Sequence, residues 1–521
     1  MTIHKAGRET VAIKFRLHLL INVCLASGLT CASLRADAAP DPHALVNTAI
    51  ERMGERRVFD SVQRLSTEED GLQNHAMDAE HPGPPYFPDY FHAEEQIDFQ
   101  LPALRRKFTV GADPLYGNNA DTVFTTSGAT AVNQRNGKTV PRRTPTPRHW
   151  LLQNPVAVLR AALAASDLKF AENETILGIS QRCVSFHQGD TFVRLFLNPL
   201  NGYLTGSEIT TTEPWEAIWD IADVRLKTIY TSWEIQSGGL HYPLEWDVFF
   251  DDYPFEMRTI SKVSVNPTFN ADQFQALADD SVPVAAGVDD FGPGPPDRPI
   301  VEIAPGVLQV TPGPRPANFS TLIVKQADGI VIIEAPTSSG WSSKIIEEAN
   351  HRFPGMPVKA VVTTDNIWWH FAGVREYAAR GIPIYVLDQN AALVGSLIAS
   401  PRTLNPDTLQ RQPRKPKLIE VNRETKIGSG PNQVVLYPIR ASTNQVLMAY
   451  LPVHRLLYTA DMAGPFGPGG SFVSPQSIWE LRTEVQRQAI KVETLVGIHL
   501  VPAPWSKLES QINDVLKSSA H

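Results

Sequence analysis

Three apolar runs between residues 321 and 387 constrain the fold of this chain more than any other feature of its sequence. They read TLIVKQADGIVIIEAP, VKAVVTTD and IPIYVL, and their length and β-branched residues are typical of strands buried on both faces. Helical stretches separate them, over 344–351 and over 374–380, where Gly381 follows as a C-cap. Later runs (VVLYPI, QVLMAYLP and LLYTADM) and the helical stretch IWELRTEVQRQAIKV continue this alternation. The pattern predicts an α/β layered domain over residues 300–521.

Residues 39–280 show a different periodicity. Helical spacing of apolar residues appears over 43–57 and 155–165, and alternating strand-like runs follow, separated by Asn-Gly, Gly-Gly and Asp-Asp-Tyr-Pro turns. This pattern predicts a β-rich N-terminal domain with a curved antiparallel sheet that holds one or two helices. The segment GGLHYPLEWDVFFDDYPFEMRTISKVSVN resembles the half-barrel of periplasmic lipoprotein-carrier proteins. That resemblance implies a concave face for an apolar ligand, and the alternative is a sheet packed on its own helices.

The two halves meet at residues 281–299, where dense Pro and Gly without periodicity predict a linker. At the other end of the chain, residues 1–38 combine a basic start, the apolar stretch LHLLINVCLASGLTCASL and an Ala-Asp-Ala exit. This order predicts a signal peptide and an exported protein, periplasmic or secreted, with an N-terminal membrane anchor as the alternative. Its removal leaves Cys183 as the one thiol, so no internal disulfide is expected.

The net charge and the hydropathy of the chain indicate which kinds of partner to expect. The formal net charge is −8, whereas a nucleic-acid-binding protein normally carries a basic surplus. No stretch after the signal peptide reaches about 18 uninterrupted apolar residues, so no further membrane span is expected. A small-molecule substrate or an apolar ligand is therefore the expected partner, rather than nucleic acid or a membrane.

Residues 300–510 resemble the metallo-β-lactamase superfamily in the order and spacing of their segments. A hairpin ends in Glu334, where the family usually has Asp, and a helix follows. The stretch VKAVVTTDNIWWHFAGVREYAARGIPIYV then reads as the family's metal-loop unit. NQVLMAYLPVHRLLYTADM resembles the strand pair that ends in a metal-bridging Asp, and VGIHLVPAPW resembles the strand whose His closes the site. The resemblance implies an αββα sandwich with its metal ligands on loops at one edge of the sheets.

The resemblance carries over only part of the family's ligand set. Alignment on Thr364, Trp368, His370 and Gly373 puts three residues of this chain at positions where the family has metal ligands of the same type. These are His370, Asp461 and His499. The positions of the other ligands hold residues that do not match, and these are Asp365, Ile367, Trp369 and Ser442. The first of the family's two zinc positions is therefore lost, and the second keeps three of its four ligands.

The retained residues predict at most one metal ion, zinc or another divalent ion, held by His370, Asp461 and His499. Three nitrogen and oxygen ligands plus water is a set that catalytic zinc sites use. Asp365 and Asp461 are the predicted catalytic carboxylates, Asp365 as a general base or a fourth ligand. A metal-free site, in which the three residues bond to one another, is the alternative. Ser442, Asp365 and His370 also supply the residue types of a Ser-His-Asp site.

Two functions follow from this reading. The first is an exported hydrolase with a reduced, at most mononuclear, metal site that acts on an ester, lactone or amide-type bond. Other reactions of the superfamily, including those of sulfatases and oxidoreductases, stay open. The alternative is a non-catalytic member of the superfamily that binds an apolar small molecule or a partner protein.

Overall fold

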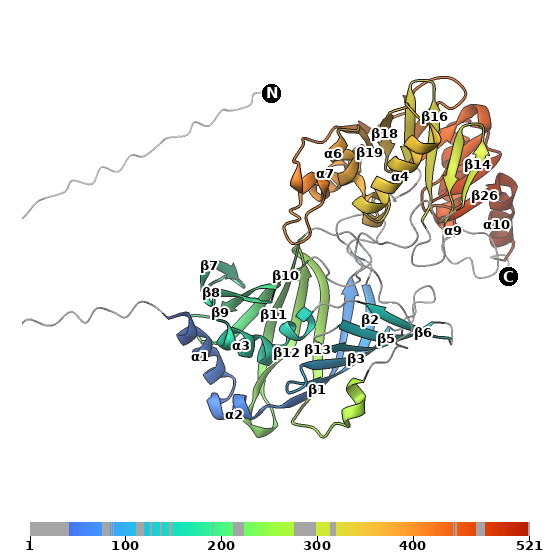
Figure 1. The fold of residues 1–521 in the computed structure, drawn as a ribbon. Helices are drawn as coiled ribbons and strands as arrows, with labels where there is room; N and C mark the ends of the chain where they lie inside the picture. The colour runs from blue at the N-terminus through green and yellow to red at the C-terminus, as the bar shows by residue number, and fades with distance from the viewer. Residues whose placement is uncertain are drawn as a thin grey trace, which may run out of the picture. The chain divides into compact units, whose positions relative to one another are not determined.

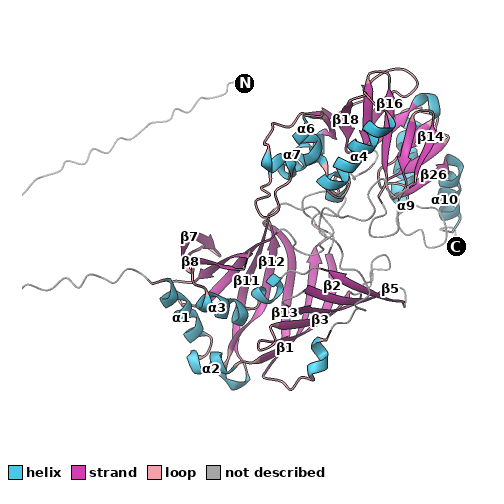
Figure 2. Cartoon of the chain, in the orientation of Figure 1, coloured by secondary structure: helices cyan, strands magenta, loops and turns pink. Residues whose placement is uncertain are grey.

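The computed structural model describes residues 41–74, 84, 86, 88–110, 119–125, 128–135, 138–144, 148–189, 191–211, 223–275, 299–312, 319–440, 442, 445–464 and 475–518. The predicted signal peptide and residues 281–298 of the predicted linker lie outside these ranges. Helices and strands occur together in the described part, which makes the chain an α+β protein with several sheets (Figures 1 and 2).

The first sheet is antiparallel throughout and, within the described residues, has 13 strands in the order β6-β5-β4-β3-β2-β1-β13-β12-β11-β10-β9-β8-β7. Two runs of strands, each consecutive in the sequence, meet where β1 pairs with β13. Buried and exposed residues alternate along β2, as expected of a strand with one covered face. The strands are β1 (Arg64–Asn74), β2 (Pro88–Asp98), β3 (Ala103–Val110), β4 (Asn119–Thr125), β5 (Gly128–Arg135), β6 (Lys138–Thr144), β7 (Lys169–Ile176), β8 (Ile179–Gln188), β9 (Thr191–Leu197), β10 (Leu204–Thr211), β11 (Val224–Ile235), β12 (His241–Phe250) and β13 (Tyr253–Val265).

Helices α1 (Pro42–Arg52), α2 (Glu55–Ser61) and α3 (Pro155–Ala164) accompany this sheet (Figure 1). Their apolar residues share one core with the strands, so the predicted sheet that packs on its own helices is present. The helical stretch predicted over 43–57 is present as two helices, α1 and α2, because Gly54 between them adopts a φ of 113°. Short 3-10 turns complete this part, namely η1 (Arg148–Gln153), η2 (Ser237–Gly239) and η3 (Ala271–Phe274).

Residues 300–504 form two further sheets in the described part, a mixed one of seven strands and one of six (Figure 2). The first contains β14 (Ile300–Ala304), β15 (Val307–Val310), β16 (Thr321–Gln326), β17 (Gly329–Ile333), β18 (Val358–Val362), β19 (Ile384–Leu387) and β20 (Leu418–Val421). The second contains β21 (Thr425–Ile427), β22 (Val434–Pro438), β23 (Leu447–Leu451), β24 (Leu456–Tyr458), β25 (Thr494–Gly497) and β26 (Leu500–Pro504). The three apolar runs of the sequence became β16 to β19, and β17, β18 and β19 are parallel neighbours.

Alternate residues along the strands of the six-stranded sheet belong to two different hydrophobic cores. Leu436 and its strand neighbours on β23 join the core of the seven-stranded sheet, whereas Val435 and Tyr437 face a separate core with α9 and α10. Helices α4, α6 and α7 pack on strands β18, β19 and β20 of the seven-stranded sheet. The helices and turns are α4 (Ser339–Arg352), α5 (Trp368–Phe371), α6 (Val374–Arg380), η5 (Asp388–Asn390), α7 (Ala391–Ala399), α8 (Thr408–Arg411), η6 (Pro452–His454), α9 (Pro475–Arg487) and α10 (Trp505–Ser518).

Two helix ends show how closely the pattern located these elements. Gly381 follows α6 with a φ of 71°, and its N–H bonds back to Ala378, which confirms the predicted C-cap. Helix α4 begins earlier than predicted, because the Ser338 side chain accepts from the N–H of Trp341 and caps the first turn. Among the described residues, no helix is both long enough and apolar enough to span a membrane.

Candidate metal centre

His370 is placed by a turn that follows the buried strand β18. The Asp365 carboxylate accepts from the N–H of Asn366 (2.7 Å) and of Ile367 (3.1 Å), which fixes the bend between strand and helix. The N–H of His370 then donates to the Ile367 carbonyl at 2.9 Å within the single turn of α5. The side chain of His370 is fully buried. Its position is therefore set by backbone geometry that begins at the end of β18.

Gly373 allows this turn to pack against the loop that follows β17. Its N–H donates to the Ala335 carbonyl at 2.9 Å, and the N–H of Ala335 donates to the His370 carbonyl at 3.3 Å. A Cβ atom at position 373 would lie 2.5 Å from the Ser338 carbonyl oxygen and 2.2 Å from the Ser342 hydroxyl. Only glycine fits this approach, so Gly373 is a structural requirement of the site.

Asp461 and His499 come from the neighbouring parallel strands β24 and β25. Asp461 follows a turn in which Ala460 has a φ of 51°, and His499 lies in the hairpin between β25 and β26. The N–H of Ile498 donates to the Ala460 carbonyl at 3.2 Å, which joins the two turns. The ring of Phe319 packs on His499 at 5.2 Å between centroids. Because parallel strands end at the same edge of a sheet, the two side chains meet there.

The structure brings the three predicted metal ligands together. One nitrogen of each imidazole and one Asp461 oxygen all lie within 4.8 Å of one another. His370 Nε2 is 4.0 Å from one Asp461 oxygen, and His499 Nε2 is 3.8 Å from the other. Zinc bonds of about 2.0–2.1 Å in a tetrahedral site place donor atoms about 3.3 Å apart. The group therefore fits a divalent ion after side-chain movements of less than about an ångström.

Electrostatics at His370 favour the form of imidazole that binds a metal. Burial, with the neighbouring His499 as the second cause, lowers the pKa of His370 well below its ordinary value. The ring is thus neutral near pH 7, and a neutral imidazole has the lone pair that a metal ligand needs. Neither ring nitrogen of His370 has a hydrogen-bond partner among the described residues.

Glu334 lies on the opposite side of the His370 ring from Asp461. One of its oxygens accepts from the N–H of Thr364 at 3.1 Å and from the Thr364 hydroxyl, and its other oxygen is 3.6 Å from His370 Nδ1. Burial raises the pKa of Glu334 well above its usual range, and the negative charge of Asp365 adds to this effect. The sequence identifies Glu334 as the acidic end of a hairpin, but no local pattern places it beside His370.

Tyr458 is a site residue that sequence reasoning missed. Its side chain is fully buried at the end of β24, and its hydroxyl has no hydrogen-bond partner within the described ranges. Burial, followed by the negative charges of Glu334 and Asp461, raises the pKa of Tyr458 well above its ordinary value. A tyrosine three residues before a ligand carries no signal in the sequence, because tyrosines are common on buried strands.

The four other positions named in the sequence analysis do not join the group of possible metal ligands. Asp365 is buried next to the turn but does not belong to the group of three possible ligands. Ser442 is described, while residues 441, 443 and 444 around it and the side chain of Trp369 lie outside the described part. Ile367 precedes α5 and has no donor atom in its side chain. The structure thus gathers the three retained family positions.

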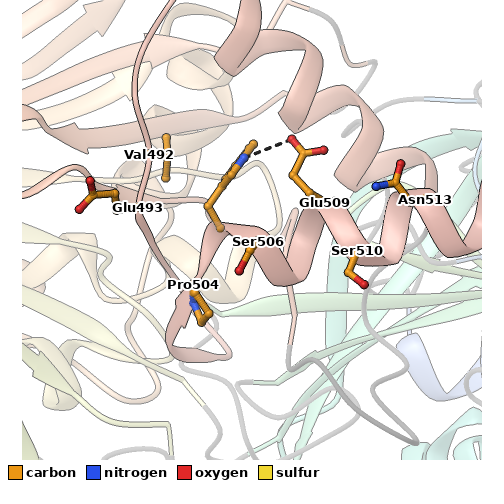
Figure 3. Close-up of a pocket in the computed structure, with 8 residues that line it drawn as sticks. Val492, Glu493, Pro504, Ser506, Glu509, Ser510 and Asn513 are labelled. Atoms are coloured by element: carbon orange, nitrogen blue, oxygen red, sulfur yellow. Dashed lines mark hydrogen bonds between the residues drawn. The ribbon is translucent and has the colours of Figure 1, made fainter.

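A separate hollow of about 610 Å³ lies at the other end of the β25–β26 hairpin from His499 (Figure 3). Glu493, Trp505 and Glu509 line it, and the indole N–H of Trp505 donates to Glu509 at 3.2 Å. Asn513 and Ser510 extend this lining along α10. None of the predicted metal ligands lines this hollow.

Comparison with known proteins gave matches in solved structures alone. No family model matches the chain, and no curated protein does. A metallo-beta-lactamase from Pontibacter korlensis is 17% identical over 41% of this chain and 97% of its own, with a TM-score of 0.32. TMB-1 is 15% identical over 44% of this chain and 99% of its own (TM-score 0.33). The metallo-beta-lactamase FIM-1 from Pseudomonas aeruginosa, in its mono-zinc form, is 16% identical over 42% and 96% (TM-score 0.32). At these scores the likeness establishes neither a family nor an activity.

Proposed function

We propose that this chain is a metal-dependent hydrolase with one divalent ion, zinc or a similar metal, at His370, Asp461 and His499. The observation that carries the proposal is the pair of short separations on Asp461, 4.0 Å to His370 Nε2 and 3.8 Å to His499 Nε2. A fully buried imidazole without a hydrogen-bond partner in the described part costs free energy, and a bound ion removes that cost.

Each residue has a separate task in this proposal. His370 and His499 act as neutral nitrogen ligands, and Asp461 supplies a carboxylate whose negative charge offsets that of the ion. When bound, the ion polarises a carbonyl group and activates water. Asp365 is the proposed general base, held in place because its carboxylate accepts from the N–H groups of Asn366 and Ile367.

The proposed substrate class is an ester, a lactone or an amide-type bond. A panel of a p-nitrophenyl ester, a simple lactone and a cyclic amide separates these three, with metal added to a chelator-treated sample as the matched comparison. Metal-dependent turnover of one of them supports the proposal, and Asp365→Asn should reduce kcat more than KM if Asp365 acts as a base.

Metal content tests the site before any substrate is known. The chain is expressed without its first 38 residues and dialysed without chelator, and zinc, iron and manganese are measured by mass spectrometry. About one equivalent is expected for the wild type, far less for His499→Ala, and no loss for Ser442→Ala. Less than a tenth of an equivalent in the wild type, with no thermal shift on adding zinc, would contradict the proposal and favour a non-catalytic binding protein. A His499→Ala variant that keeps its metal would show that the ligands are different.

We also propose that the chain is exported to the periplasm or secreted and that residues 1–38 are removed. The basic residues, the apolar stretch and the Ala36-Asp37-Ala38 exit support this proposal. When the full-length chain is expressed in a bacterium and purified from the periplasm or the medium, N-terminal sequencing should show that it begins at Ala39. A chain that still begins at Met1 and sediments with membranes would instead support the anchor.

A further inference from the structure

Three buried side-chain atoms of Glu334 and His370, at the candidate metal centre, have no hydrogen-bond partner in the described part of the chain. Within the described residues these are Glu334 Oε2, His370 Nδ1 and His370 Nε2. Glu334 Oε2 faces His370 Nδ1 at 3.6 Å, and His370 Nε2 faces Asp461 at 4.0 Å on the other side of the ring. Buried polar atoms are nearly always hydrogen-bonded, so three unpartnered atoms on two side chains that face each other require an explanation.

The direction of the Glu334 side chain is fixed from two sides. Its backbone N–H donates to the Val362 carbonyl at 2.9 Å, and its φ of 79° turns the chain at the end of β17. The N–H and hydroxyl of Thr364 both donate to Oε1. With Oε1 held there, Oε2 is left to face the imidazole ring.

The tautomer of His370 decides whether it can bind a metal at the proposed position. A neutral imidazole carries one proton, so Nε2 offers a lone pair only when the proton is on Nδ1. An oxygen that accepts the Nδ1–H bond selects this tautomer and fixes the ring plane. The contact of 3.6 Å is too long for a hydrogen bond, and a closure of about 0.7 Å brings it to the usual length.

We propose that Glu334 is a positioning residue that accepts the Nδ1–H of His370 and thereby directs Nε2 toward the ion shared with Asp461 and His499. This inference rests on the proposed function, because it needs a metal at that position. Glu334 itself does not touch the ion or the substrate. Its effect passes through the orientation and tautomer of one ligand.

Glu334→Gln is the decisive variant, because it keeps the size of the side chain and reverses one interaction. The glutamine carbonyl takes over the role of Oε1 as acceptor for Thr364, so its NH₂ group faces His370 Nδ1. An N–H donor at that place favours the Nε2–H tautomer, which has no lone pair for the ion. Zinc affinity, measured by competition with a chromophoric chelator, should fall by roughly 10- to 100-fold. Glu480→Gln is the matched control, since Glu480 is also buried but lies on α9, and its affinity should equal that of the wild type.

Nitrogen-15 NMR of the imidazole gives a readout that a merely structural role would not move. In the zinc-loaded wild type the His370 signals should show a protonated Nδ1 and a metal-bound Nε2, and a protonated Nε2 would overturn the proposal. If Glu334→Gln does not fold, Glu334→Asp keeps the carboxyl group and withdraws its oxygens by one methylene, and an intermediate loss of affinity is expected. Unchanged zinc affinity in a folded variant would refute the role of Glu334 while leaving the metal site intact. A wild type that binds no metal would instead refute the proposed function.

Discussion

Substitution of Glu69 by Gln should change how the stability of the N-terminal sheet responds to pH. Five buried charged residues from β1, β2, β3 and β13 form one cluster, and these are Glu69, Glu95, Arg106, Glu256 and Arg258. Glu256 lies closest to the guanidinium groups, at 2.7 Å from Arg106 and 3.0 Å from Arg258. Glu69 lies 3.8 Å from each arginine. With three acids and two arginines, the cluster has one carboxylate in excess.

Glu69 is the carboxyl group of this cluster that is hardest to ionise. Burial, followed by the negative charge of Glu95, raises the pKa of Glu69 from its ordinary value of 4.5 to about 7, although both arginines oppose the shift. For Glu256, burial is outweighed by Arg106 and Arg258, which hold its pKa below the ordinary value. Glu69 therefore keeps its proton in the folded chain under conditions where the unfolded chain has released it.

The sign of the pH dependence follows from this difference. Between pH 4.5 and 7 the folded state binds more protons at Glu69 than the unfolded state, so the free energy of unfolding falls as the pH rises through this window. Linkage with these two pKa values gives a loss of about 2–3 kcal/mol between pH 5 and pH 8. Glu69→Gln removes this loss, and its amide oxygen can still accept from the Thr67 hydroxyl, which lies 3.0 Å from the carboxylate. Relative to the wild type, the variant should gain about 2–3 kcal/mol over the same range.

Hydrogen exchange followed by mass spectrometry measures this effect on the full chain. Peptides from β1 and β13 report the opening free energy of the sheet itself, without requiring the whole chain to unfold in one step. Glu68→Gln is the control, because Glu68 is the neighbouring acid on the same strand but is only half-buried and pairs with Lys262. Equal pH dependence of the wild type and Glu69→Gln would refute the assignment of the excess charge to Glu69.

Three other predictions concern the local geometry and the metal. Gly373→Ala should lower the free energy of unfolding by about 2–4 kcal/mol, because its Cβ would overlap the Ser338 carbonyl; a melting temperature equal to that of the wild type would contradict this. Asn154→Ala should cost about 1–2 kcal/mol in chemical denaturation, since the Asn154 side chain caps α3 by accepting from the N–H groups of Val156 and Ala157; Asn154→Ser should recover most of the loss. Zinc at about 100 times its Kd should stabilise the wild type by about 2.7 kcal/mol, and a chelator should abolish the gain; an equal gain for His499→Ala would point to another site.

The sequence located most elements of the C-terminal part because their pattern is local. Gly381 as a C-cap and the buried runs that became β16 to β19 follow from residue type and spacing alone. The break between α1 and α2 at Gly54 was not predicted, because apolar residues continue at helical spacing on both sides of this glycine. Its positive φ of 113° is a property of the folded backbone that residue spacing does not encode. The expected sheet on helices in the N-terminal part is present, whereas its order of strands, with β1 joined to β13, could not be read from alternation.

The candidate site divides in the same way. By itself the sequence determined which residue types stand at the ligand positions, and so that His370, Asp461 and His499 could bind one ion and that Ile367 could not. Only the tertiary structure decided that their donor atoms lie within 4.8 Å of one another, since two parallel strands and a turn after β18 bring them together. It also decided that Glu334 faces His370 and that Tyr458 is buried beside the carboxylates. Such relations depend on packing between segments far apart in the chain, and no local pattern encodes them.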